Sequence, residues 1–256
     1  MRIQNSRSRR GFLAGALGTA CAALLSGCDA LSKTQWFPKL MAAGEHLNRG
    51  AQDLITSRKS MAQEFTEADL SPEFRSNGTN YPNDPQYRAH AQTEFANWAL
   101  RVDGLVNRPS DFSLAQLRAM RSRTQITRHD CVEGWSAIGK WTGVPLGAVL
   151  AVVQPQPRAR YAVFHCADVM DDGARYYESI DLDDAYHAQT ILAYALNGRA
   201  LPIANGAPLR VRIERQLGYK MAKYVMRIEL VDSFHAIADG AGGYWEDRGY
   251  QWYAGI

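Results

Sequence analysis

Alternation of apolar and polar residues is clearest in the last quarter of the chain. Residues 209–214 and 224–230 alternate in this way, which is typical of half-buried strands. Further strands are predicted where apolar runs are bounded by turn residues, at 98–106, 124–127, 160–167 and 175–180. Short strands mixed with short helices, without a β–α–β rhythm, predict an α+β fold.

Short helices are predicted where a capping residue precedes an apolar stretch. Ser113 is the expected cap of one such helix, and Asp181 is the expected cap of another. Pro145 is expected at the first position of an apolar helix that ends at Val153, because its fixed φ suits that position.

Three segments are interpreted from their composition. Asn, Gly and Pro at nearly every step predict an ordered polar loop over 75–88, and residues 141–145 read as a turn. Residues 240–256 contain five aromatic side chains. Because disordered tails are poor in aromatic residues, this segment is predicted to pack as a flap.

The first 27 residues are interpreted as an export signal that is not part of the fold. They hold four arginines and no acidic residue, and their apolar run is short and rich in Gly and Ala for a membrane-spanning helix. Residues 8–13 resemble a twin-arginine signal, and residues 25–28 resemble a bacterial lipobox. We therefore expect export to the periplasm and a lipid anchor at Cys28. A general secretory signal and an uncleaved anchor are the alternatives.

The rest of the chain has a balanced charge. The full sequence has 29 basic and 26 acidic residues and a net charge of +3, but without the signal 25 basic residues face 26 acidic ones. A globally basic surface for nucleic acid is therefore unsupported. We expect a linker with a peripheral helix over 28–75, in which apolar residues between Leu40 and Leu54 have a loose helical spacing, and a catalytic domain over 76–256.

Cys131 is the first candidate for chemistry. It follows Arg128 and His129, the kind of electropositive setting that lowers a thiol pKa and yields a thiolate, which is the form that ligates metals. Two alternatives stay open, namely a small core residue and a disulfide with Cys166. A zinc site that also uses His165 is disfavoured, because adjacent residues on a strand point to opposite faces.

Four segments, taken in order, resemble the molybdopterin-binding domain of the sulfite oxidase family. They are Cys131–Ser136, Trp141–Leu146, Leu201–Arg210 and Gly218–Tyr224. The likeness runs from about Asn77 to the C-terminus and is greatest to the exported bacterial branch that includes periplasmic methionine-sulfoxide reductase. Taken singly, Asn205–Gly206 also reads as a hairpin turn and Arg210 as a surface residue.

The resemblance implies a Mo-molybdopterin cofactor. It makes Cys131 the thiolate ligand of molybdenum, and Asn205 and Arg210 the residues that hold the pterin and its phosphate. It also implies a phosphate-binding stretch at Met221, Ala222 and Lys223. Further pterin contacts are implied at Asn77, Asn80, Tyr81 and Cys166.

The sequence departs from the family pattern at two of these places. The loop at 77–81 lacks the aromatic and acidic pair of the reductase branch, and Cys166 stands where that branch has a threonine. A thiol is a poorer hydrogen-bonding partner than a hydroxyl. Candidates for substrate contact are Arg128, His129 and Tyr219.

The function that this resemblance implies is oxygen-atom transfer to or from a small substrate. Reduction of an S-oxide or N-oxide such as methionine sulfoxide is the first expectation, and sulfite oxidation is the second. A lipoprotein module that binds without catalysis is the alternative from another class. The chain has no Cys-x-x-Cys-His haem motif and too few residues after Leu230 for an immunoglobulin-like dimerisation domain. We therefore expect a separate electron-transfer partner, such as a membrane haem protein or a cytochrome.

Overall fold

The computed structural model describes residues 59–256 together with Thr34, Trp36, Gly50 and Ser57. Residues 58–256 form one compact unit. The predicted export signal, Cys28 and most of the predicted peripheral helix lie outside the described residues. Among the described helices, none has both the length and the apolar character needed to cross a membrane.

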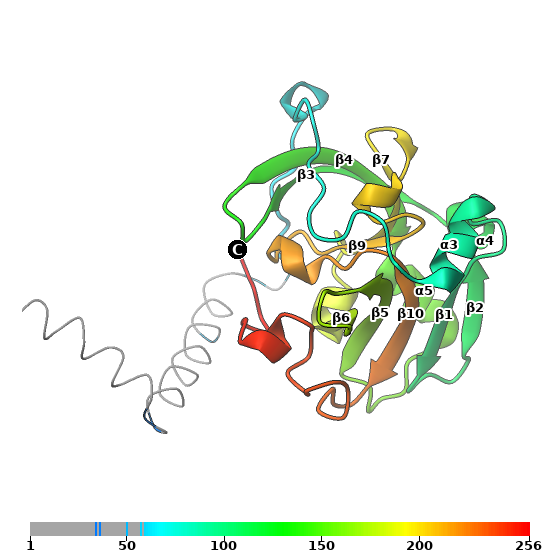
Figure 1. Cartoon of the computed structure of the whole chain (residues 1–256), viewed down its shortest axis with the longest axis vertical. Coiled ribbons are helices and arrows are strands. Elements are labelled where there is room, and N and C mark those ends of the chain that lie inside the picture. The colour runs from blue at the N-terminus through cyan, green and yellow to red at the C-terminus, as the bar shows by residue number, and fades with distance from the viewer. Residues whose placement is uncertain (1–33, 35, 37–49, 51–56, 58) are drawn as a thin grey trace, which may run out of the picture. The chain divides into compact units, whose positions relative to one another are not determined.

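Two five-stranded sheets form the framework of this unit (Figure 1). The first sheet has the order β2-β1-β10-β5-β6, in which β1 and β10 are parallel and the other pairs are antiparallel. Its strands are β1 (Ala99–Gly104), β2 (Ser110–Ser113), β5 (Tyr161–Val169), β6 (Arg175–Asp181) and β10 (Val225–Val231).

The second sheet is antiparallel and has the order β3-β4-β7-β8, with β9 paired to β7. Its strands are β3 (Arg123–Asp130), β4 (Ser136–Pro145), β7 (Ile191–Leu196), β8 (Arg199–Ala200) and β9 (Arg210–Arg212). The turn between β7 and β8 uses Asn197 and Gly198 at φ 50° and 75°, the left-handed conformation that a tight hairpin requires.

Short helices connect these strands. They are η1 (Glu67–Asp69), α3 (Pro85–Gln92), α4 (Leu114–Ala119), α5 (Leu146–Val153), α6 (Leu182–Ala185), η2 (Ile203–Asn205), η3 (Gly218–Lys220) and η4 (Glu246–Arg248). Both predicted caps are confirmed: the side chain of Ser113 accepts from Gln116 N, and that of Asp181 accepts from Asp184 N. The predicted α+β fold is confirmed as well.

Two local predictions are wrong. Residues 141–145 form no turn but the end of β4, where they pair with both β3 and β7. Gly143 fits there because β7 approaches so closely that a Cβ atom would lie 2.3 Å from Leu192 O. The polar loop ends before Pro85, because Asp84 accepts a hydrogen bond from Tyr87 N and Pro85 opens α3.

Phe65 and Phe74, which precede the expected catalytic domain, contact the second sheet. Phe65 N donates to Ile126 O over 2.8 Å. The buried Phe74 ring meets the ring of Trp141 edge-on, with 4.9 Å between their centroids. The final part of the expected linker thus lies against the second sheet, whose strand β3 leads into Cys131.

Candidate active site

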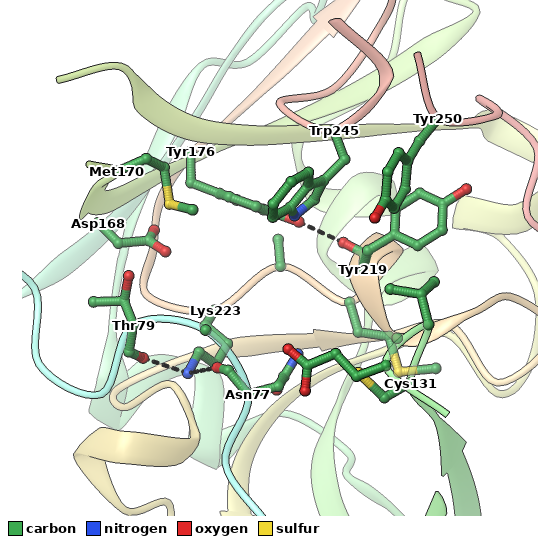
Figure 2. A pocket seen from close by; sticks show the side chains of 16 residues that line it. Asn77, Thr79, Cys131, Asp168, Met170, Tyr176, Tyr219, Lys223, Trp245 and Tyr250 are labelled. Atoms are coloured by element: carbon green, nitrogen blue, oxygen red, sulfur yellow. Dashed lines mark hydrogen bonds between the residues drawn. The ribbon is translucent and has the colours of Figure 1, made fainter. Parts of the chain in front are cut away.

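Cys131 lies in the turn that connects β3 to β4. Its N–H donates to Trp135 O over 2.9 Å, and Gly134 N donates to Cys131 O over 3.0 Å. Gly134 has a φ of 85°, which favours glycine. This turn places the half-exposed Cys131 on the wall of a cavity (Figure 2).

The cavity is built from segments that are far apart in the sequence. Its lining consists of Asn77, Gly78, Thr79, Cys131, Val132, Glu133, Asp168, Met170, Tyr176, Gly218, Tyr219, Met221, Ala222, Lys223, Trp245 and Tyr250. Cys131 and Tyr219 lie on one side of the view in Figure 2, Asp168 and Thr79 lie on the other, and Lys223 lies between them. Asn77, Cys131, Tyr219, Met221, Ala222 and Lys223 were predicted site residues and lie together here.

Arg128 and His129 do not supply the electropositive setting expected for Cys131. The pKa of its thiol is raised, chiefly by burial, although nearby backbone N–H groups and Arg210 act in the opposite direction. Arg128 is mostly exposed and pairs with Asp130 at 2.9 Å, outside the cavity lining. Without a metal, Cys131 is therefore a thiol rather than an activated nucleophile. Metal coordination deprotonates such a thiol.

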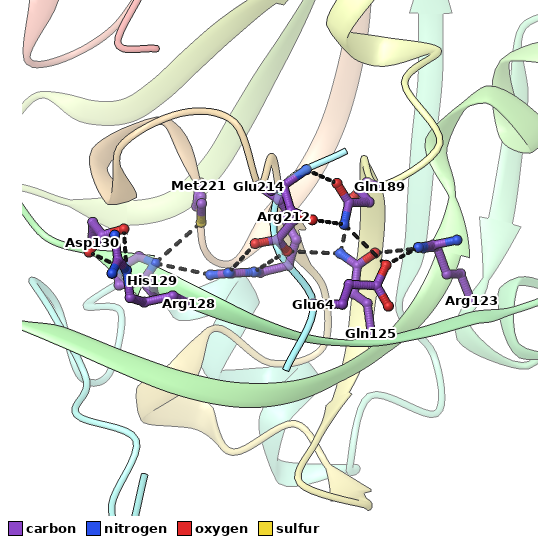
Figure 3. A network of polar contacts seen from close by, with 11 residues as sticks. Glu64, Arg123, Gln125, Arg128, His129, Asp130, Gln189, Arg212, Glu214 and Met221 are labelled. Atoms are coloured by element: carbon purple, nitrogen blue, oxygen red, sulfur yellow. Dashed lines mark hydrogen bonds and ion pairs between the residues drawn. The ribbon is translucent and has the colours of Figure 1, made fainter. Parts of the chain in front are cut away.

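His129 is fully buried and lies outside the cavity lining, within a network of polar contacts (Figure 3). Its Nδ1 lies 3.0 Å from Arg212 Nη1 and 3.2 Å from Met221 Sδ. Its pKa is well below the usual value, first because of burial and then because of neighbouring cations that include Arg210. His129 is thus a neutral acceptor for Arg212. A Cβ atom on Gly218 would lie 2.4 Å from the imidazole ring. The η3 segment therefore packs directly against His129.

Arg210 is a fully buried cation, not a surface residue. Its guanidinium donates to Asn205 O over 3.3 Å and to Asn77 Oδ1 over 3.4 Å, and its Nε has no partner among the described residues. Burial and the charge of Arg212 lower its pKa to about 9. Arg212, on the same strand, has a carboxylate partner in Glu214 at 2.6 Å. Arg210 therefore carries a buried charge that no described carboxylate pairs.

Lys223 adds a second cation. Its Nζ donates to Asn77 O, Thr79 O and Ala204 O over 2.6, 2.5 and 2.8 Å. These bonds use all three ammonium hydrogens, so Lys223 connects the polar loop to η2. It can attract an anion through its positive charge but has no hydrogen left to donate to it. Burial lowers its pKa to about 7.

These residues fit the anionic end of a pterin cofactor. Asn205 Nδ2 and Arg210 Nε are buried donors without a partner among the described residues, which is costly unless a ligand accepts from them. A phosphate would supply both the acceptors and the negative charge. Cys131 would supply a soft thiolate ligand for molybdenum.

Five of the predicted cofactor contacts lie outside the cavity lining, namely Asn80, Tyr81, Cys166, Asn205 and Arg210. Asn80 is exposed and accepts from the Ser76 hydroxyl over 2.6 Å, and Tyr81 is exposed beside Arg88. Cys166 is buried on β5 and lines a different cavity. Both Cys131 and Cys166 are free thiols, so the disulfide alternative is wrong.

An aromatic wall, which we define as Tyr219, Trp245 and Tyr250, encloses the Cys131 side of the cavity. Trp245 and Tyr250 stack with centroids 5.2 Å apart, and Tyr250 meets Tyr219 edge-on at 5.3 Å. The Tyr219 hydroxyl donates to Gln251 O over 2.6 Å, which holds the tail against η3. The sequence predicted a packed aromatic tail but not that two of its rings line the site.

Comparisons with known proteins agree on one family. Residues 87–236 match the model described as the oxidoreductase molybdopterin binding domain. A putative protein-methionine-sulfoxide reductase subunit YedZ1 from Azospira oryzae is 35% identical over 248 residues, which are 97% of this chain and 88% of the relative.

Two further similarities cover less of the chain. The protein-methionine-sulfoxide reductase catalytic subunit MsrP from Xanthomonas campestris pv. campestris is 37% identical over 155 residues, which are 57% of this chain and 48% of the relative. This chain thus spans about half the length of that protein. In the crystal structure of the sulfane dehydrogenase SoxCD from Paracoccus pantotrophus, a chain with 22% identity aligns with a TM-score of 0.49 over 54% of this chain and 39% of its own.

Proposed function

Because the chain belongs to the oxidoreductase molybdopterin binding domain family, we propose that it is a molybdenum enzyme that reduces an S-oxide such as methionine sulfoxide. The observation that carries this proposal is that Cys131 and the aromatic wall line one cavity, near Arg210, a buried cation whose Nε has no partner among the described residues. Both relatives named as methionine-sulfoxide reductase subunits support the same substrate class.

The chain divides the work between two groups of residues. Arg210 and Asn205 would hold the cofactor through its anionic end, and Cys131 would ligate its metal. The bound cofactor supplies the two-electron oxygen-atom transfer. We expect the rest of the cavity to position the substrate and to limit the access of water, because the aromatic wall shares the lining with Cys131.

The charge of the lining favours a neutral substrate over sulfite. Of the described residues that line the cavity, Lys223 is the one cation, and its ammonium is committed to three carbonyl groups. Glu133, close to Cys131 in the sequence, is an acid in the same lining. An anion such as sulfite would find no free cation there, whereas a sulfoxide needs none.

An assay with two electron carriers tests the direction. We expect the purified mature protein to oxidise reduced viologen when methionine sulfoxide is added, and an N-oxide serves as a second oxidant. The second assay measures the opposite direction, the oxidation of sulfite with reduction of an oxidised cytochrome. Turnover in that second assay alone would show that the proposed direction is wrong.

Replacement of Trp245, one ring of the aromatic wall, should weaken substrate binding. In a Trp245→Leu variant we expect the KM for methionine sulfoxide to rise about tenfold, since contacts of sulfur with an aromatic ring are worth up to about 1.5 kcal/mol. The kcat should change little, because Trp245 contributes binding rather than chemistry. Tyr186→Leu, at an exposed ring outside the cavity lining, is the matched control. Equal KM values in the two variants would remove Trp245 from the substrate site.

The proposal includes a place in the cell and a partner. The twin-arginine and lipobox-like segments support export to the periplasm and a membrane anchor at Cys28. The relatives are named as subunits, which supports delivery of electrons by a separate protein, for which a membrane haem protein is our first candidate.

A further inference from the structure

One lysine and two glutamates form a buried cluster outside the cavity lining, which we call the buried triad: Lys220, Glu178 and Glu246. The ammonium of Lys220 donates to Glu178 Oε1 and to Glu246 Oε1. None of the three side chains is more than 1% exposed. The lysine belongs to η3 and the glutamates belong to β6 and η4, so the buried triad joins three segments that are remote in the sequence.

Each member of the buried triad lies next to an aromatic residue of the cavity. Its lysine directly follows Tyr219, and the glutamate of η4 directly follows Trp245. Tyr176, two residues before the glutamate of β6, also lines the cavity, and its hydroxyl donates to Tyr219 O over 2.6 Å (Figure 2). The ion pairs therefore hold together the backbone segments that carry these rings.

The backbone of the tail approaches β6 closely at this point. Gly243 forms an isolated bridge with Glu178, and Tyr244 N donates to Tyr177 O over 3.0 Å. A Cβ atom on Gly243 would overlap Glu246 Oε2 and would lie 2.6 Å from Glu178 Oε1. Glycine at this position therefore leaves the room that the two carboxyl groups occupy.

One ammonium faces two carboxyl groups, so the buried triad keeps a proton. Burial is the chief cause of a pKa of Glu178 well above its usual range; Lys220 opposes this shift, and Glu246 adds to it. One carboxyl group is therefore protonated at neutral pH and can donate to the other, and the triad as a whole is neutral. The nearby titratable side chains are neutral as well, because burial raises the pKa of each: they are Tyr176, Tyr177 and Cys166.

We infer that the buried triad positions the aromatic wall and thereby sets how tightly the cavity binds a sulfoxide. Its members are positioning residues, because none of them lines the cavity. A buried ionic cluster adds little net stability, and an attested use of such groups is to specify one arrangement. The effect on the substrate rests on the proposed function, whereas the effect on the tail does not.

Two substitutions at one position separate positioning from bulk. Glu246→Leu fills a similar volume but cannot accept from Lys220, so it detaches η4 from the buried triad. Lys220 keeps its ion pair with Glu178, so no buried charge is left unpaired and the variant should fold. Glu246→Gln keeps an acceptor for the ammonium and has a donor in place of the retained proton, so it should behave like the wild type.

Hydrogen–deuterium exchange of the holoenzyme measures the position of the tail without any substrate. The amides of Tyr244 and Tyr250 donate to Tyr177 O and Trp245 O. We expect both to exchange about ten times faster in Glu246→Leu than in Glu246→Gln, the effect of one lost charge-assisted hydrogen bond. Amides of β1 should be unchanged, because only a loss of the whole fold would expose them.

Kinetics test the consequence for the substrate. In Glu246→Leu we expect the KM for methionine sulfoxide to rise about tenfold, as in Trp245→Leu, because the ring is displaced. The kcat and the molybdenum content should change little. Gly243→Ala, which places a methyl group against both carboxyl groups, should give the same result. Glu229→Leu, the same change at an ion-paired glutamate of β10, should leave KM unchanged.

Equal exchange of the tail amides in the two variants at position 246 would overturn the inference. Faster exchange of the tail in an active enzyme whose KM is unchanged would overturn it as well, and faster exchange throughout the chain would assign Glu246 to the fold as a whole. A wild-type protein that does not reduce methionine sulfoxide would instead contradict the proposed function, and the exchange comparison would still decide whether the buried triad positions the aromatic wall.

Discussion

A Cys131→Ser variant is expected to fold normally and to lose its oxygen-transfer activity by about three orders of magnitude or more, as when a residue at a reacting centre is removed. Folding should persist because Cys131 is half-exposed and its turn is fixed by backbone hydrogen bonds to Trp135 and from Gly134. A hydroxyl lacks the soft sulfur donor that suits this metal. Steady-state oxidation of reduced viologen with methionine sulfoxide measures the loss.

Cys166→Ser is the matched control for this prediction. Cys166 is buried, and its thiol donates a long hydrogen bond to Phe164 O over 3.9 Å. A buried hydroxyl without a good partner should lower the free energy of unfolding by about 1–3 kcal/mol. Molybdenum should nevertheless stay bound, because Cys166 lies outside the lining. Wild-type turnover in Cys131→Ser, together with loss of molybdenum only in Cys166→Ser, would show that Cys166 and not Cys131 ligates the metal.

The two arginines of β9 should respond in opposite ways to the same substitution. Arg210→Met removes a buried charge that has no described carboxylate partner, so we expect the cofactor-free protein to be as stable as the wild type or more stable. Cofactor content should fall at least tenfold, because the charge-assisted hydrogen bonds from the guanidinium to the phosphate are lost. Both guanidinium groups lie over the Trp141 ring, so methionine retains part of that packing in either variant.

Arg212→Met should instead destabilise the protein whether or not cofactor is bound. It leaves the buried Glu214 carboxylate without its cation, which costs about 3–5 kcal/mol for pairs of this kind. Gln125 still donates to Glu214 over 2.8 Å, so the lower end of that range is expected. Urea unfolding of both cofactor-free variants gives the free energies, and metal analysis gives the occupancy. Equal losses of stability would contradict the assignment of Arg210 to an anion.

Local signals in the sequence account for much of the fold. The caps Ser113 and Asp181 and the alternation in β10 act over a few residues, so they can be predicted without knowledge of the partners. β9 is a strand as predicted, but its residues are all buried rather than alternately buried. The end of β4 could not be predicted in this way. Its glycine and proline read as a turn, but pairing with β7, and for Gly143 with β3 as well, holds them extended.

The site could be predicted only in part. Cys131, Asn205 and Arg210 could be proposed as site residues only because their order along the chain resembles a family. Asp168 and Trp245 were missed, because β5 and the C-terminal tail reach the cavity through contacts that are remote in sequence. A weak local signal for Trp245 existed in the aromatic composition of the tail.

X-ray absorption at the molybdenum edge tests the central claim most directly, because it counts the sulfur atoms bound to the metal. The purified holoenzyme and Cys131→Ser, loaded with cofactor to a measurable level, would be compared under the same conditions. We predict one sulfur neighbour fewer in the variant than in the wild type. An unchanged number of sulfur neighbours, or a wild-type protein that contains no molybdenum when made with an intact pterin pathway, would contradict the account.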